Sequence, residues 1–122
     1  MEYSAISLRS PRASVVYTGP HDTDTCQGWF DTASQEEKED YFRYLGRRAD
    51  RDVAWEFIRM AEISVADTAI LQLQDVLGLG KEARMNTPGG TGGNWLWRYR
   101  PENLTRQLSA RLAEITKVYD RS

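Results

Sequence analysis

The stretch from Val15 to Thr25 constrains the fold more than any other, because it joins the end of a strand to the start of a helix. The β-branched and aromatic residues 15–17 predict a short strand, which Gly19-Pro20 ends. Residues 23–25 all favour a helix N-cap, so a helix is expected to follow directly. A strand, a break and a helix start form one unit of a (β/α) barrel, in which catalytic residues lie at the carboxyl ends of strands.

His21 and Asp22 lie side by side where this predicted strand has just ended. The position suits a catalytic or substrate-binding pair, since the carboxyl ends of parallel strands line the site of such a barrel. The simpler interpretation is that Asp22 or Asp24 caps the following helix and that His21 is a turn residue. From this stretch alone both interpretations stay open.

A second strand is predicted over residues 68–73, with the polar pair Gln74-Asp75 at its end. Two amphipathic helices lie between the strands, one over 34–45 and one from Asp50 or Asp52 to about residue 67. A connection of this length is typical of parallel neighbours. We therefore expect an α/β fold with two adjacent parallel strands.

Cap signals mark the ends of the predicted helices. Ser34 stands three residues before Glu37, which is the spacing of a capping box, and Gly46 can end that helix. Thr105 can cap a final helix. The apolar side chains of this last helix recur at helical spacing and form one stripe: Leu108, Leu112, Ile115 and Tyr119.

Composition excludes several classes of function. Sixteen basic and 18 acidic residues give a net charge of −2, which offers no reason to expect nucleic acid or an anionic membrane as a partner. The lone His21 excludes metal sites that need several histidines, and no metal or cofactor is expected. The single Cys26 excludes an internal disulfide. Residues 1–10 lack the apolar core of a signal peptide, and a cytoplasmic protein is expected.

The longest irregular segment is predicted over residues 81–94 and contains four glycines. The glycine spacing fits neither a dinucleotide-binding loop nor a Walker A loop. A long loop in a compact chain more often binds a ligand or closes over one than merely connects two elements. An alternating aromatic stretch follows it, over residues 95–100.

Three motifs stand in a fixed order along the chain. They are Val15–Gly19 with His21-Asp22, Asp24-Thr25 and Gly28-Trp29; then Gln74-Asp75 with Leu77-Gly78-Leu79-Gly80; and then Glu82–Asn86 with Pro88, Gly93-Asn94-Trp95 and Trp97-Arg98. In this order and at this spacing they resemble the 4-α-glucanotransferases, or amylomaltases, of glycoside hydrolase family 77. The third motif is the most specific. The resemblance covers roughly residues 11–119.

The resemblance implies a fold and a reaction. The fold would be a (β/α)8 TIM barrel, of which residues 1–122 would form a single partial domain, the C-terminal portion with the last two strands and their helices. At 122 residues the chain is too short for a complete barrel, which needs about 250. The reaction would cleave an α-1,4 bond of a maltooligosaccharide and pass the glycosyl unit to the 4-hydroxyl of another glucan, by a retaining mechanism.

The resemblance also implies roles for individual residues. Asp22 would be the transition-state stabiliser, accepting hydrogen bonds from two sugar hydroxyls, and His21 would contact substrate beside it. Weaker candidates either contact the glucan or shape their loop: Arg84, Asn86, Asn94 and Trp95. Trp97 and Arg98 are expected to be structural. Gln74 and Asp75 fit a role in the site and a structural role equally, since Asp75 could cap the turn after the strand.

The nucleophile and the acid/base of the family lie on earlier barrel strands, and no motif in these 122 residues resembles theirs. We therefore expect the N-terminal part of the same barrel as the partner of this chain, and no activity from the chain alone. Two other interpretations remain. One is a non-catalytic carbohydrate-binding module built on the aromatic residues of the third motif, which would need a closed core of its own. The other is an inactive gene remnant.

Overall fold

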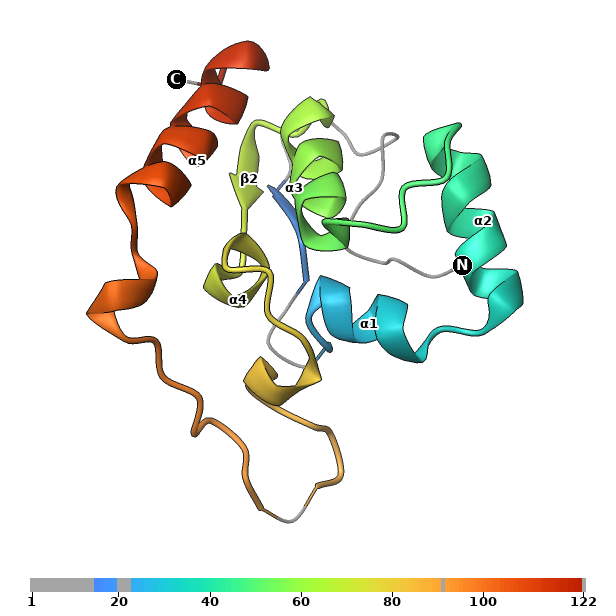
Figure 1. The fold of residues 1–122 in the computed structure, drawn as a ribbon, viewed down its shortest axis with the longest axis vertical. Helices are drawn as coiled ribbons and strands as arrows, with labels where there is room; N and C mark the ends of the chain where they lie inside the picture. Colours follow the sequence, from blue (N-terminus) through green and yellow to red (C-terminus); the bar gives the residue numbers. More distant parts are fainter. Residues whose placement is uncertain (1–14, 20–22, 91, 122) are drawn as a thin grey trace.

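The computed structural model describes residues 15–19, 23–90 and 92–121. Two short strands, β1 (Val15–Tyr17) and β2 (Thr68–Ile70), pair in parallel, with Val16 opposite Ala69. The chain passes from β1 to β2 through three helices, α1 (Cys26–Thr32), α2 (Gln35–Leu45) and α3 (Val53–Ile63). The predicted pair of adjacent parallel strands is confirmed. Figure 1 shows α3 packed beside both strands, with α1 and α2 on one side of it.

The elements after β2 are short until the last helix. They are α4 (Leu73–Val76), two 3₁₀ turns, η1 (Lys81–Ala83) and η2 (Pro101–Asn103), and α5 (Arg106–Val118). Between η1 and η2 the chain forms an irregular arm that extends away from the helices, drawn in orange in Figure 1. After this arm, α5 lies beside β2 and contacts α3.

Three helices begin where the sequence predicts caps. The Ser34 hydroxyl accepts from the Glu37 amide at 3.1 Å, and the Glu37 carboxylate accepts from the Ser34 amide at 3.0 Å, so the capping box is confirmed. Thr105 caps α5 by accepting from the Leu108 amide at 3.1 Å. Thr25 caps α1 in the same way. Gly46 ends α2 with a φ of 78°, a left-handed conformation that glycine adopts without strain.

Two predicted boundaries are wrong. The strand predicted over 68–73 ends at Ile70, because the Gln72 amide turns to the Thr18 hydroxyl at 3.0 Å and α4 begins at Leu73. Gln74 and Asp75 therefore lie within a short helix rather than at a strand end. The helix predicted to reach residue 67 ends at Ile63.

The core consists of three clusters, and α3 contributes to each of them. Phe57 and Met60 pack with Tyr41 and Phe42 of α2 and with Cys26, while Trp29 and Phe30 lie against this group. Ala61 packs with Val16 of β1. Trp55 and Ile58 pack with Val76, against the apolar stripe of α5 that the sequence predicts: Leu108, Leu112 and Ile115. The position of α3 thus fixes both the strands and the helices around them.

Within the described ranges, none of the helices has the length and the apolar composition needed to cross a lipid bilayer.

Candidate functional site

The segments that follow β1 and β2 meet at the carboxyl edge of the sheet. The Thr18 amide donates to the Ile70 carbonyl at 3.1 Å, which extends the strand pairing by one residue. Beyond it, the Gln72 amide donates to the Thr18 hydroxyl at 3.0 Å, and the Gln72 side-chain amide donates to the Gly19 carbonyl. The two segments are therefore joined by hydrogen bonds where a barrel of parallel strands builds its site.

The two principal candidates, His21 and Asp22, lie outside the described residues. The residues on either side of them are described, from Val15 to Gly19 and from Thr23 onward. Their surroundings bear on the capping interpretation, because the N-cap of α1 is Thr25, whose hydroxyl accepts from the Gly28 amide at 3.0 Å. Asp24 accepts from the Thr25 amide at 2.8 Å. The position that Asp22 would fill as a helix cap is thus held by Thr25.

Asp75 comes from α4 and reaches back to the start of α1. Its Oδ1 atom accepts from the amide of Cys26, the first residue of α1, at 2.8 Å. Asp75 is 1% exposed, and its Oδ2 atom has no hydrogen-bond partner among the described residues. Burial raises the pKa of Asp75, while the hydrogen bond from the Cys26 amide opposes that rise. Asp75 therefore caps a helix 49 residues away in the chain, not the turn that follows β2.

Cys26 lies beside this carboxylate. Its side chain is 5% exposed, and its thiol contacts the Thr18 carbonyl at 3.7 Å. Burial raises the pKa of Cys26 well above its usual value, and the negative charge of Asp75 raises it further. Cys26 is thus a structural residue in this fold and not an activated nucleophile.

Gln74 connects the second motif to the third. It is buried, and its side-chain amide donates to the carbonyl of Ala83 in η1 at 3.2 Å. The 3₁₀ turn η1 in turn contacts α1. Both polar residues of the second motif therefore make structural hydrogen bonds, and the structure favours the structural role for each.

The candidates of the third motif make hydrogen bonds that close their own loop. Arg84 donates through Nε to the Asn86 carbonyl at 2.9 Å, and Asn94 Oδ1 accepts from the Thr87 amide at 2.9 Å. The Trp95 amide donates to the Met85 carbonyl at 2.5 Å, and Trp95 has a φ of 61°. The Trp95 side chain is 50% exposed. These bonds fit the loop-shaping interpretation, and glucan contact by the four residues stays a prediction.

Arg98, which is expected to be structural, lies just beyond that loop and makes hydrogen bonds to the backbone. Its Nη1 atom donates to the carbonyls of Trp95 and Trp97, at 3.4 and 3.3 Å. Both acceptors belong to the backbone of the same arm. In the part of the chain that the structure describes, no three histidine, cysteine or acidic side chains lie close enough together to hold a metal ion.

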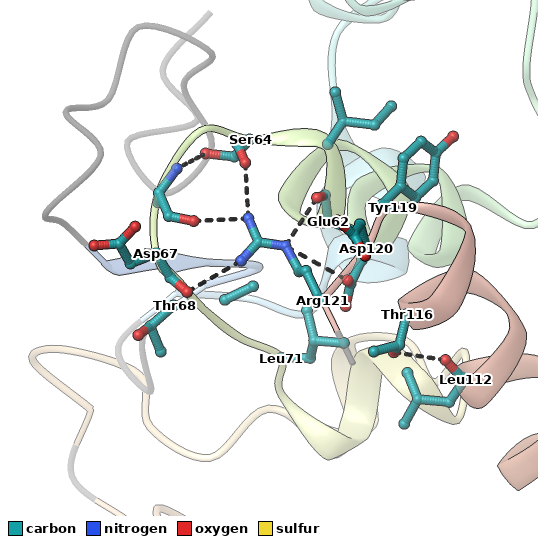
Figure 2. Close-up of a pocket in the computed structure, with 13 residues that line it drawn as sticks. Glu62, Ser64, Asp67, Thr68, Leu71, Leu112, Thr116, Tyr119, Asp120 and Arg121 are labelled. Carbon is teal, nitrogen blue, oxygen red and sulfur yellow. Dashed lines mark hydrogen bonds and ion pairs between the residues drawn. The ribbon is translucent and has the colours of Figure 1, made fainter.

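A cavity of about 750 Å³ lies away from this edge, at the amino end of β2. Figure 2 shows the Arg121 side chain within it, its guanidinium directed at the backbone where α3 ends. Arg121 donates to the carbonyls of Glu62, Ser64 and Ala66 at 2.9, 2.7 and 2.8 Å. None of the described site candidates lines the cavity. The cavity thus belongs to the attachment of α5, not to the predicted site.

Sequence reasoning missed two residues that organise this structure, Gln72 and Arg121. Gln72 lies inside the stretch predicted as a buried strand, and nothing in its local sequence points to the Gly19 carbonyl. Arg121 bonds to backbone more than 50 residues away. Local spacing carries no signal for such contacts.

Comparisons with known proteins give one consistent result. A family model described as 4-alpha-glucanotransferase matches residues 4–105. The 4-alpha-glucanotransferase of Synechocystis sp. is 48% identical over 108 residues, covering 88% of this chain and 21% of that protein. The enzyme of the same name from Thermus thermophilus is 44% identical over 112 residues, covering 88% of this chain and 22% of that protein.

Solved structures agree with the sequence comparisons. The amylomaltase from Streptococcus agalactiae, solved in complex with acarbose, matches with a TM-score of 0.86 and 34% identity. That match covers 93% of this chain and 23% of the amylomaltase. The chain spans about a fifth of the length of the relatives it matches. On the match of the family model to most of its residues, the chain belongs to the 4-alpha-glucanotransferase family.

Proposed function

We propose that residues 1–122 form the C-terminal portion of a (β/α)8-barrel 4-α-glucanotransferase, contributing the last two strands and the transition-state stabiliser of its site. The observation that carries the proposal is the carboxyl edge of the β1–β2 pair, where the segments after both strands are joined through Gln72. In the sequence, His21 and Asp22 of the first motif follow Gly19, the last described residue after β1. In a barrel of parallel strands, this is the edge at which substrate binds.

In this proposal Asp22 acts on the sugar whose glycosidic bond breaks. A retaining transfer passes through a transition state with oxocarbenium character, and hydrogen bonds from ring hydroxyls to a carboxylate strengthen as that charge develops. Asp22 would accept two such bonds, and His21 would contact a hydroxyl beside it. Bonds that tighten in the transition state raise the rate more than they raise substrate affinity.

The nucleophile and the acid/base would come from the N-terminal part of the same barrel, which would also pair with the open strand edges. The substrate would be a maltooligosaccharide or a longer α-glucan, and the setting the cytoplasm. The half-exposed Trp95 could stack on a sugar ring from the arm. The chain alone is expected to release no glucose from maltotriose above a mock-purified control.

The test uses a hybrid enzyme in which this chain replaces the matching C-terminal fifth of the Synechocystis relative. Asp22→Asn keeps the size of the side chain but removes the charge that strengthens its hydrogen bonds. Two charge-assisted bonds of about 1.5–3 kcal/mol each predict a loss of roughly 10²- to 10⁴-fold in kcat. KM should change little, because the loss falls on the transition state.

Asp24→Asn is the matched control, because it makes the same change two residues away and keeps the oxygen that accepts from the Thr25 amide. It should leave kcat within a few-fold of the parent hybrid. If Asp22 only shaped the turn, Asp22→Asn would behave like this control, because Asn serves in caps and turns about as well as Asp. An active, well-folded Asp22→Asn enzyme would therefore reject the site assignment.

A further inference from the structure

Two side chains from one short stretch bond to both ends of the segment that carries the first motif. Gln72 precedes α4 and donates to the Gly19 carbonyl, while Asp75 lies within α4 and accepts from the Cys26 amide at 2.8 Å. Gly19 and Cys26 are the described residues where that segment leaves β1 and where it enters α1. The spacing of three residues places both side chains near the segment from a single turn of chain.

Burial makes the bond to Asp75 hard to replace. Gly19, Cys26 and Asp75 are all buried, and Asp75 is only 1% exposed. Water therefore cannot readily replace Asp75 when it is removed, and the Cys26 amide stays unsatisfied, whereas the bond from Gln72 to Gly19 is only partly buried. The bond to Asp75 also satisfies one of the amides that an α-helix leaves unpaired in its first turn.

Close packing around Gly19 leaves this part of the segment little freedom. A Cβ atom added at Gly19 would lie 2.8 Å from the Thr23 hydroxyl and 3.6 Å from the Gln72 side-chain nitrogen. Thr18 adds a third connection, because its hydroxyl accepts from the Gln72 amide at 3.0 Å. The described ends of the segment are thus held by side-chain and backbone hydrogen bonds to the chain after β2.

We infer that Gln72 and Asp75 are positioning residues for glucan transfer, which fix the Gly19 carbonyl and the Cys26 amide, the described ends of the segment that carries the first motif. The effect on transfer rests on the proposed function, whereas the two hydrogen bonds do not. Neither side chain is assigned a contact with substrate. Their effect on the rate comes through the backbone they hold.

The variants separate hydrogen bonding from packing. Asp75→Ala removes the acceptor for the Cys26 amide, and Asp75→Asn keeps an acceptor oxygen of the same size. Gln72→Glu keeps the shape of Gln72 but cannot donate to the Gly19 carbonyl, since a carboxylate only accepts. On exposed positions of α5, Glu114→Ala also removes a carboxylate and Gln107→Glu repeats the change of Gln to Glu, and both serve as controls.

The first measurement uses the 122-residue chain and needs no activity. Cys26 is its single cysteine and is 5% exposed, so alkylation by iodoacetamide reports opening at the start of α1. We expect slow labelling in the parent and in both controls.

Asp75→Ala and Gln72→Glu should label about 10- to 100-fold faster, because each loses one strong hydrogen bond. Asp75→Asn should stay within about threefold of the parent. Removing the Asp75 charge also lowers the pKa of the thiol, and Asp75→Asn removes the same charge, so any increase that Asp75→Asn shares with Asp75→Ala is assigned to the thiol and not to the lost hydrogen bond.

The second measurement is the split between kcat and KM in the hybrid enzyme. Asp75→Ala and Gln72→Glu should lower kcat by about 10- to 100-fold with KM within about threefold, while Asp75→Asn restores kcat. A purely structural role would lower the amount of folded enzyme and leave kcat per active site unchanged, so active sites are titrated first. Rapid labelling of the parent chain, or kcat per active site unchanged in both disruptive variants, would overturn the inference. An active Asp22→Asn enzyme would instead reject the proposed function, and the labelling result would still decide whether the two bonds hold the segment.

Discussion

Replacing Arg121 with methionine removes the guanidinium that holds α5 to the end of α3, while keeping a long apolar side chain in the cavity. Arg121 donates three bonds of 2.9 Å or less to the carbonyls of Glu62, Ser64 and Ala66, and two longer ones to Ala61 and Asp67. A cation near the last turn of a helix also interacts favourably with the helix dipole. The substitution therefore removes the hydrogen bonds from Arg121 and its favourable interaction with the helix dipole at the same time.

The expected loss follows from these contacts. Hydrogen bonds to a charged group contribute about 1.5–3 kcal/mol each, and bonds that share one donor group do not add fully. The Arg121 side chain is 16% exposed, so solvent screens it little, although water can reach some of the vacated carbonyls. We expect Arg121→Met to lower the free energy of unfolding by about 2–4 kcal/mol, near the range for removing one partner of a buried ion pair.

Glu62 gives this loss a pH dependence. Its carboxylate is 6% exposed and pairs with Arg121 at 3.6 Å. Burial raises the pKa of Glu62 and Arg121 opposes the rise, so removing Arg121 raises that pKa further. A carboxyl group with a raised pKa in the folded state lowers stability progressively as pH rises from its unfolded-state pKa through its folded-state pKa, so the loss should be larger in mildly alkaline than in mildly acidic buffer. In a Glu62→Gln background the difference between the two buffers should disappear.

Urea unfolding followed by tryptophan fluorescence measures the loss, and Trp55 in the core of α3 provides a buried reporter. Lys117→Met, an exposed change in the last turn of α5, is the control. A loss below about 0.5 kcal/mol, the usual range for surface substitutions, would show that these bonds contribute nothing net and would refute the reasoning.

Two further substitutions test single features of the core and of a helix start. The Tyr41 hydroxyl is buried without a hydrogen-bond partner in the described structure, and its ring stacks on Phe57 at 5.6 Å, so Tyr41→Phe should leave stability unchanged or raise it by up to about 1–3 kcal/mol. A drop in melting temperature would show that the hydroxyl is satisfied in solution. Ser34→Ala removes the acceptor for the Glu37 amide and should cost about 0.5–2 kcal/mol, whereas Ser34→Asp should retain most of the stability. Equal stability of the two variants in urea would contradict the contribution of the capping box.

The features predicted correctly from the sequence are those in which cause and effect lie within a few residues. The Ser34 and Thr105 caps each satisfy an amide three residues ahead, and Gly46 ends α2 through its own backbone conformation. The parallel pairing of β1 and β2 followed from the length of the connection, which does not depend on its details. All the residues that determine such features lie within a short stretch of the sequence.

The errors arise where a distant residue decides the local structure. Gln72 leaves the strand because its amide bonds to Thr18, 54 residues earlier. Asp75 accepts a hydrogen bond from the amide of Cys26 at the start of α1. The position of Asp75 just after the predicted strand therefore could not show that it caps α1. For the site itself, the roles of His21 and Asp22 came from the resemblance and stay predictions, because both lie outside the described residues.

Because α3 belongs to all three core clusters, its backbone amides are exposed to solvent only when the whole protein unfolds. Most α3 side chains are buried, whereas no side chain of α5 is. Amides of α5 and α2 can exchange with solvent deuterium through local fraying, since each helix has one face in water. Amides in the middle of α3 can exchange only when all three clusters separate at once. Their exchange rates therefore report the global free energy of unfolding, and the difference from α5 measures how independently the last helix detaches.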